Sequence, residues 1–167
     1  MKASRAFVLL LVLVCLATGM SAGQDVQKHL VSDEGELIIN FSSEFAGIEE
    51  STDVIKFNSP DGVPGIFQIS KNPELHNQNM TEALLSQAAK IAHQDQVPLR
   101  DGMFDGKLIP VAELVKRQGL VYATMIRLSE SDTILTVMTS GKVFDSLMKN
   151  TTYRKVGLEE DTFTSSS

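Results

Sequence analysis

Residues 108–139 read Leu-Ile-Pro-Val-Ala-Glu-Leu-Val-Lys-Arg-Gln-Gly-Leu-Val-Tyr-Ala-Thr-Met-Ile-Arg-Leu-Ser-Glu-Ser-Asp-Thr-Ile-Leu-Thr-Val-Met-Thr, and this stretch decides the fold class. It consists of three runs rich in β-branched and other apolar residues, joined by the turn-forming pair Gln118-Gly119 and by a polar segment. The runs span 108–116, 120–128 and 133–139. Pro110, near the start of the first run, is typical of an edge strand or a bulge because proline has no N–H to donate. The stretch predicts an antiparallel meander of three strands.

The segment before the meander predicts the clearest helix of the chain, from Met80 to Gln94. Asn79 is a suitable N-cap, and Glu82 stands three residues later, where a capping box has its acid. Apolar residues recur at helical spacing along one face, namely Met80, Leu84, Ala88, Ile91 and Ala92. A second, shorter helix is predicted at 143–149, after the end of the meander.

The first half of the chain contains alternating apolar residues that predict further strands. These span 36–41, 53–58 and 63–70, with the beginning of another at 45–48. Ser59-Pro60-Asp61-Gly62 predicts a turn, because proline presets φ and glycine accepts a positive φ. Residues 24–33 are polar and predict a loose arm or a short helix, and residues 71–78 predict a loop.

Together these elements predict a single α+β domain over residues 24–161, with helices packed on an antiparallel sheet. The order of elements from Val54 to Lys149 resembles that of the PsbP-like superfamily, which includes PsbP-, Mog- and DcrB-type proteins. The resemblance lies in architecture and spacing, so no binding residue of the family is carried over. It implies an α/β/α sandwich and a non-enzymatic accessory or binding role.

The N-terminal segment 1–23 predicts a secretory signal peptide. Lys2 and Arg5 are followed by an apolar run from Ala6 to Ala17, which is shorter than the roughly 20 residues of a membrane-spanning helix. Small residues up to Gly23 suit a signal peptidase, so we expect an exported protein, periplasmic or extracellular. An uncleaved anchor is the alternative. The C-terminal segment 162–167 is rich in Ser and Thr and predicts a disordered tail.

Charge and cysteine content limit the functions of the released protein. The chain has 15 basic and 21 acidic residues; the signal segment holds Lys2 and Arg5 and no acid, so 13 and 21 remain, a net charge of −8. Such a surface disfavours nucleic acid, which is bound through excess Lys and Arg. Removal of the signal segment also removes Cys15, the single cysteine. Thiol catalysis, disulfides and Cys-ligated metals are therefore excluded.

The sequence predicts no catalytic residue and no cofactor site, and its metal candidates are weak. His76 precedes the predicted helix, while His93 and Asp95 stand at its end. These three side chains would be the ligands of a metal site, although they lack a recognised ligand spacing. The other interpretation places His93 as a cation at a helix C-terminus and His76 as a solvated loop residue.

Two further patterns concern modification and ligand binding. Asn40, Asn79 and Asn150 each begin an Asn-x-Ser/Thr sequon and are glycosylation candidates if the protein is eukaryotic. Four methionines lie in the C-terminal half, namely Met103, Met125, Met138 and Met148. Two interpretations are open: they fill the core, or they line a ligand groove that adapts to varied partners. The sequence favours core filling.

These observations favour an exported, non-catalytic accessory or binding protein, with one sheet face or the loop at 71–79 as its contact surface. The first alternative is a small hydrolase or metal-assisted enzyme that uses His76 and His93. The second is an immunity or inhibitor protein, whose acidic surface would bind a basic exported partner.

Overall fold

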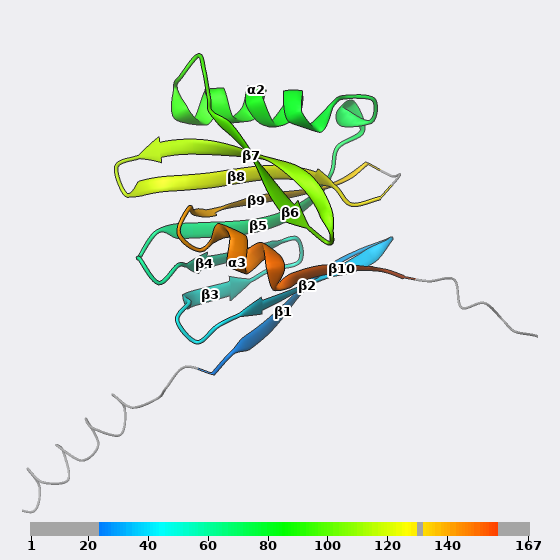
Figure 1. Ribbon diagram of the computed structural model, residues 1–167. Helices are drawn as coiled ribbons and strands as arrows, with labels where there is room; N and C mark the ends of the chain where they lie inside the picture. Colours follow the sequence, from blue (N-terminus) through cyan, green and yellow to red (C-terminus); the bar gives the residue numbers. More distant parts are fainter. Residues whose placement is uncertain (1–23, 130–131, 157–167) are drawn as a thin grey trace, which may run out of the picture.

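The computed structural model describes residues 24–129 and 132–156 of the chain. Within them lie ten β-strands, two α-helices and one 3₁₀-helix, η1 (Pro73–Leu75). Seven strands form a large sheet in which every neighbouring pair is antiparallel (Figure 1). Their order is β3 (Ala46–Glu50), β4 (Val54–Asn58), β5 (Pro64–Lys71), β9 (Thr133–Ser140), β8 (Gly119–Arg127), β7 (Lys107–Lys116) and β6 (Leu99–Phe104).

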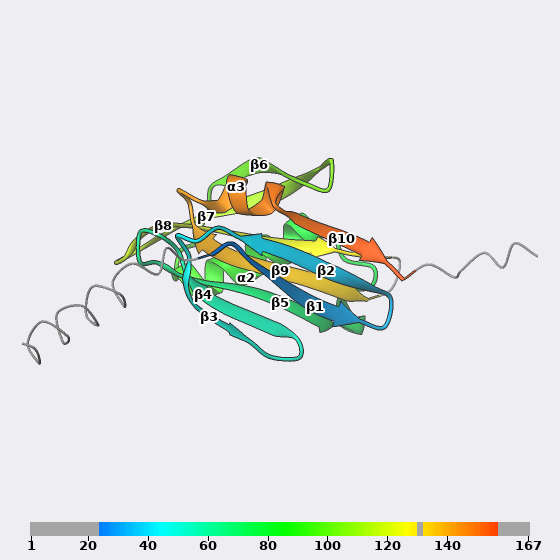
Figure 2. The ribbon, with the colours of Figure 1, turned by 90° about the horizontal axis from the view of Figure 1, so that it is seen from below.

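A second sheet of three strands packs on one face of the large sheet. Its order is β1 (Val26–Ser32), β2 (Gly35–Phe41) and β10 (Thr151–Lys155), and helix α3 (Phe144–Lys149) lies beside it (Figure 2). Leu37 and Phe41 of β2 and Phe67 of β5 are fully buried in one apolar cluster, together with Phe144 of α3. This cluster is the main core of the protein.

Helix α2 (Met80–Ala92) packs on the opposite face of the large sheet, against β7 and β8. Leu84 and Ala88 of the helix and Leu114 of β7 are buried in a second apolar cluster. The small alanine side chain allows the helix to approach the sheet closely. As predicted, Asn79 caps α2: its Oδ1 accepts a 2.8 Å hydrogen bond from the N–H of Thr81.

Strand β7 changes its pairing partners along its length. Residues 107–112 pair with β6, whereas residues 112–116 pair with β8. Both ladders include Ala112. Strand β8 continues beyond this point, because it pairs with β9 as far as Arg127. The part of β7 that precedes Ala112 therefore turns away from β8 together with β6, as Figure 1 shows.

The predicted α+β class is wrong. The described residues form a β-rich fold of two antiparallel sheets with two helices. The error arose mainly from three strands that the sequence did not reveal, β1, β6 and β10. Strand β1 was interpreted as a loose arm or short helix because Gln27, Lys28 and His29 are polar. It is an edge strand, and Leu30 is its one fully buried side chain.

The other two missed strands have equally polar sequences. Strand β10 reads Thr-Thr-Tyr-Arg-Lys and is also an edge strand. Strand β6 contains Asp101-Gly102, a pair typical of turns, but the chain turns only at Asp105-Gly106, with φ of 49° and 74°. Two successive positive φ values are typical of a tight hairpin turn. An edge strand needs few apolar side chains, so its sequence carries a weak signal.

The predicted signal segment 1–23 and tail 162–167 lie outside the described residues. In the part of the chain that the structure does describe, no helix has the length and apolar character that crossing a membrane requires.

Candidate functional site

The divergence of β7 from β8 opens a cleft with a volume of about 290 Å³, which we call the β7–β8 cleft. It is lined by Met80, Phe104, Asp105, Lys107, Leu108, Ile109, Pro110, Met125, Ile126, Arg127, Leu128 and Tyr153. The lining is mostly apolar with a few polar groups, and the volume is near the lower limit for small-molecule sites.

Pro110 stands at the place where the cleft opens. Because proline has no N–H, it cannot donate to β8 and extend the β7–β8 ladder. Its carbonyl oxygen instead accepts a 2.7 Å hydrogen bond from the buried hydroxyl of Thr124. The predicted edge-type position of Pro110 is confirmed in this limited sense: β7 pairs only with β6 at this residue.

The apolar walls of the cleft include side chains from α2, β8 and β7. Met80, the first residue of α2, faces it from one side, and Met125 of β8 from another. Leu108 of β7 lies at the rim and is 72% exposed. A leucine side chain this exposed gains from contact with an apolar ligand, since burial stabilises by about 25 cal/mol per Å².

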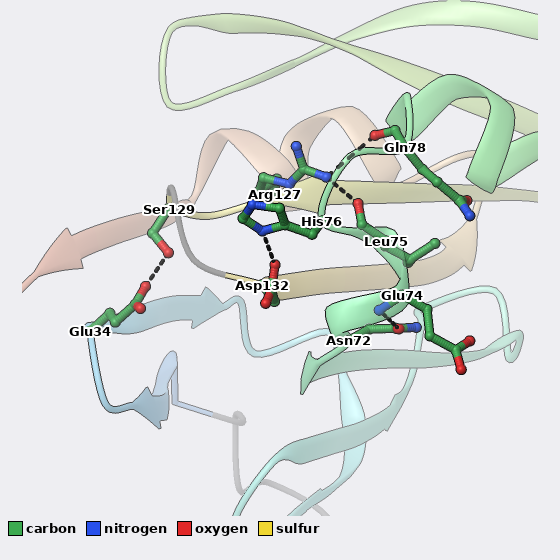
Figure 3. Close-up of polar contacts among 9 residues, drawn as sticks. All are labelled: Glu34, Asn72, Glu74, Leu75, His76, Gln78, Arg127, Ser129 and Asp132. Atoms are coloured by element: carbon green, nitrogen blue, oxygen red, sulfur yellow. Dashed lines mark hydrogen bonds and ion pairs between the residues drawn. The ribbon is translucent and has the colours of Figure 1, made fainter.

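Arg127, the last residue of β8, supplies a charge to the cleft. Its Nη2 donates to the main-chain carbonyl oxygens of Leu75 and Gln78, the latter at 3.3 Å (Figure 3). Its Nε is buried and has no hydrogen-bond partner. In the described ranges no ion pair includes Arg127, so its charge is not balanced by a carboxylate there.

The loop between β5 and α2 is held beside the cleft by several polar contacts, which Figure 3 shows. Nδ1 of His76 lies 2.6 Å from Oδ1 of Asp132, and Asn72 caps η1. At the start of the loop Lys71 pairs with Asp33, which lowers the pKa of Asp33 below its ordinary value. The contact of Arg127 with two loop carbonyls joins this loop to β8.

Tyr153 of β10 closes another part of the cleft. Its ring is half-buried, and its hydroxyl is buried without a hydrogen-bond partner. The hydroxyl packs against the backbone of Gly35, where an added Cβ would lie 2.4 Å from it. A glycine is therefore required at 35 for Tyr153 to occupy this position.

The predicted metal candidates do not come together around one site. His76 follows η1, whereas His93 ends α2 with a φ of 52°. The 13-residue helix between them is about 20 Å long at 1.5 Å per residue. Asp95 lies near His93 in sequence and is exposed, and in the described ranges no three His, Cys, Asp or Glu residues are grouped to hold a metal.

The three sequon asparagines all lie outside the cores. Asn79 caps α2, and its side chain is engaged by the N–H of Thr81. Asn40 and Asn150 are neighbours in space, since the side-chain amide of Asn40 donates to the carbonyl oxygen of Asn150 at 3.3 Å. A sugar on Asn40 would disrupt this contact.

The methionines divide between core and clefts. Met148 is buried in the main core, and Met125 is 8% exposed, in the α2 cluster and at the wall of the β7–β8 cleft. Met138 packs partly on the α2 cluster. Met103 is 54% exposed on β6. The expectation of core filling thus holds for Met148, whereas Met125 has both roles.

Other hollows offer less specific chemistry. One, of about 620 Å³, lies between the β6–β7 hairpin and α3. Its Arg100 is already paired with Asp145 at 2.5 Å, and this pairing raises the pKa of Arg100. Another hollow, of about 240 Å³, lies between α2 and the uncovered part of the sheet. The β7–β8 cleft is the stronger candidate because its Arg127, unlike Arg100, forms no ion pair in the described ranges.

The sequence analysis did not single out Arg127 or the cleft. A sequence signal for Arg127 was present, because it is the one charged residue in the otherwise uncharged run from 120 to 128. The cleft itself depends on the change of partner at Ala112, which no local pattern reveals.

Comparison with protein-family models gives no match for this chain. Comparison with curated proteins gives no match either. The resemblance to the PsbP-like superfamily therefore remains a prediction.

Proposed function

We propose that this chain is an exported, non-catalytic binding protein, and that the β7–β8 cleft takes a small ligand with an apolar body. The export of the protein rests on the signal-peptide pattern of residues 1–23. The binding role rests on the chemistry of the cleft.

One observation carries the proposal: Arg127, which forms no ion pair in the described ranges, lines an open, mainly apolar cleft. A ligand that offers an acceptor to this guanidinium group and an apolar body to the walls gains from both contacts. Apolar walls with one or two convergent polar groups are the usual composition of a small-molecule site.

The surroundings of the cleft support binding without catalysis. Among the described residues that line it, none is a Ser, Cys or His. Most of the side chains present are apolar, and the polar ones are Arg127, Lys107, Asp105 and Tyr153, which can hold and orient a ligand. The loop of residues 72–78 is fixed by His76 and Arg127, so the cleft is largely formed before a ligand arrives. A preformed site loses less entropy on binding.

The test is an NMR titration of the ¹⁵N-labelled protein with 1-octanol, an uncharged apolar probe. We expect saturable shift changes in the amides of β7 and β8 around 108–110 and 125–128. Leu108→Ser should weaken binding about five- to tenfold, because it removes part of an apolar wall. Val115→Ser is the matched control: Val115 is on the same strand and 70% exposed, against 72% for Leu108, but lies outside the cleft. Shift changes that do not saturate, or an equal loss in both variants, would contradict the proposal.

A further inference from the structure

We infer that the ligand of the β7–β8 cleft is an amphipathic monocarboxylate, a short acyl chain whose carboxylate binds Arg127. This inference rests on the proposed binding function and adds the chemical class of the ligand. Three features support it: the charge of the cleft, the guanidinium group of Arg127, and the walls and volume of the cleft.

The charge of the cleft is opposite to that of the protein. Arg127 and Lys107 line the cleft, with Asp105 as the one carboxylate among the lining residues described. The chain after residue 23 carries a net charge of −8, as counted above. A local positive excess on an acidic protein attracts an anion to this place and not to the remaining surface.

The guanidinium group of Arg127 suits a carboxylate. Nη2 donates to two main-chain carbonyl oxygens, which fixes the plane of the group. Nε is buried, so a ligand contacts the part of the half-buried side chain that remains exposed in the cleft. A guanidinium group stays charged in proteins, and a charge-assisted hydrogen bond to a carboxylate is about twice as strong as a neutral one. An ionised carboxylate is thus a better acceptor here than a hydroxyl group.

The walls and the volume limit the rest of the ligand. Met80, Leu108 and Met125 offer apolar contact, and methionine side chains adapt to a flexible chain. At about 290 Å³ the cleft is near the lower limit for small-molecule sites, which favours a short chain over a long one. Octanoate, with eight carbons and two oxygens, is a suitable short-chain probe.

The experiment compares three eight-carbon probes that differ only in the head group: octanoate, 1-octanol and octylammonium. Each is titrated into the ¹⁵N-labelled protein at low salt. We expect octanoate to bind at least tenfold more tightly than 1-octanol, and octylammonium more weakly than 1-octanol. We expect Arg127→Gln to abolish the preference for octanoate over 1-octanol, because it removes the charge that distinguishes the two head groups.

Two further variants keep the test decisive if Arg127→Gln does not fold. Arg127→Lys retains the charge but lacks the planar guanidinium group and should reduce the preference several-fold. Lys107→Gln changes the second cation of the cleft, which is exposed, and should reduce the preference less than Arg127→Lys does. The shift changes should be centred on 125–128 in the wild type.

Each failure has a distinct meaning. If octanoate and 1-octanol bind equally well at the cleft, the carboxylate inference is overturned and the proposed binding function stands. If none of the three probes gives a saturable response, both are overturned. A preference for octanoate that Arg127→Gln and Arg127→Lys leave unchanged places the carboxylate elsewhere and also overturns the inference.

Discussion

Thr124 Oγ1 donates a 2.7 Å hydrogen bond to the carbonyl oxygen of Pro110 across the point at which β7 and β8 part. Thr124 is fully buried, so no solvent can replace this bond. A side-chain hydroxyl thus takes the place of a main-chain contact at the closed end of the β7–β8 cleft. The bond sets where the divergence begins.

We predict that Thr124→Val destabilises the protein by about 1–2 kcal/mol, because the change leaves the Pro110 carbonyl without its donor at nearly constant side-chain shape. Urea denaturation of the wild type and the variant gives this difference. Thr136→Val is the control, since Thr136 on β9 is only half-buried and makes no recorded side-chain hydrogen bond within the described residues. Equal losses in the free energy of unfolding would show that the hydrogen bond from Thr124 to Pro110 does not contribute to stability.

We predict that Tyr153→Phe leaves the free energy of unfolding unchanged or raises it by up to about 1 kcal/mol. The Tyr153 hydroxyl is buried without a partner, so its removal ends a desolvation cost. Tyr153→Ala, by contrast, should destabilise by about 3 kcal/mol, because the ring packs on the main core. Thermal denaturation followed by circular dichroism distinguishes these results. A clear loss of stability in Tyr153→Phe would mean that the hydroxyl has a partner.

We predict that Asp61 stabilises the fold at neutral pH and that this contribution disappears in acid. Asp61 accepts hydrogen bonds from Ser140 Oγ at 2.6 Å and from Ser59 Oγ at 2.5 Å, and these hydroxyls lower the pKa of Asp61 below its ordinary value of 3.8. A carboxyl group with a lowered pKa in the folded state adds stability above its unfolded pKa. That stability is lost as the pH falls through the folded value.

The corresponding experiment measures urea midpoints of the wild type and Asp61→Asn between pH 7 and pH 2. The wild type should be more stable at pH 7, and the difference should shrink as the pH falls below 3.8. Asp95→Asn is the control, because the exposed Asp95 makes no recorded contact in the described part of the chain. A difference for Asp61→Asn that stays constant over this range would refute the linkage.

We predict that His76→Gln increases the proteolytic sensitivity of the loop at 72–78 by several-fold. The substitution weakens the contact of Nδ1 with Asp132, one of the links between this loop and the start of β9. Limited proteolysis with mass-spectrometric mapping locates the cleavage. His93→Gln is the matched control, since His93 lies at the other end of α2 and should leave the loop protected. Cleavage that rises equally in both variants would contradict the role of His76.

The strands and the helix with strong local signals were predicted from the sequence. The three strands of the meander and the Asn79 cap all depend on residues close together in the chain. Strands β1 and β10 were missed because polar edge strands are stabilised by their partner β2 and not by their own composition. The second sheet, and with it the β-rich class, could not be inferred without that pairing.

The candidate site was less accessible to sequence analysis than the fold. Loop 71–79 was proposed as a contact surface, and it does lie beside the β7–β8 cleft. The role of Arg127 depends on contacts with Leu75 and Gln78, about 50 residues away in the chain. Contacts between residues so far apart in the chain are determined by tertiary packing, so local patterns in a single sequence do not predict them.

The change of partner at Ala112 also couples the two faces of the large sheet. Ala112 is fully buried and belongs to the same apolar cluster as Ala83 and Ala88 of α2. The residue at which the hairpin leaves β8 is therefore packed beneath α2. A substitution at Ala83 or Ala88 that changes how closely the helix approaches the sheet should also change the width of the cleft, although neither alanine lines it.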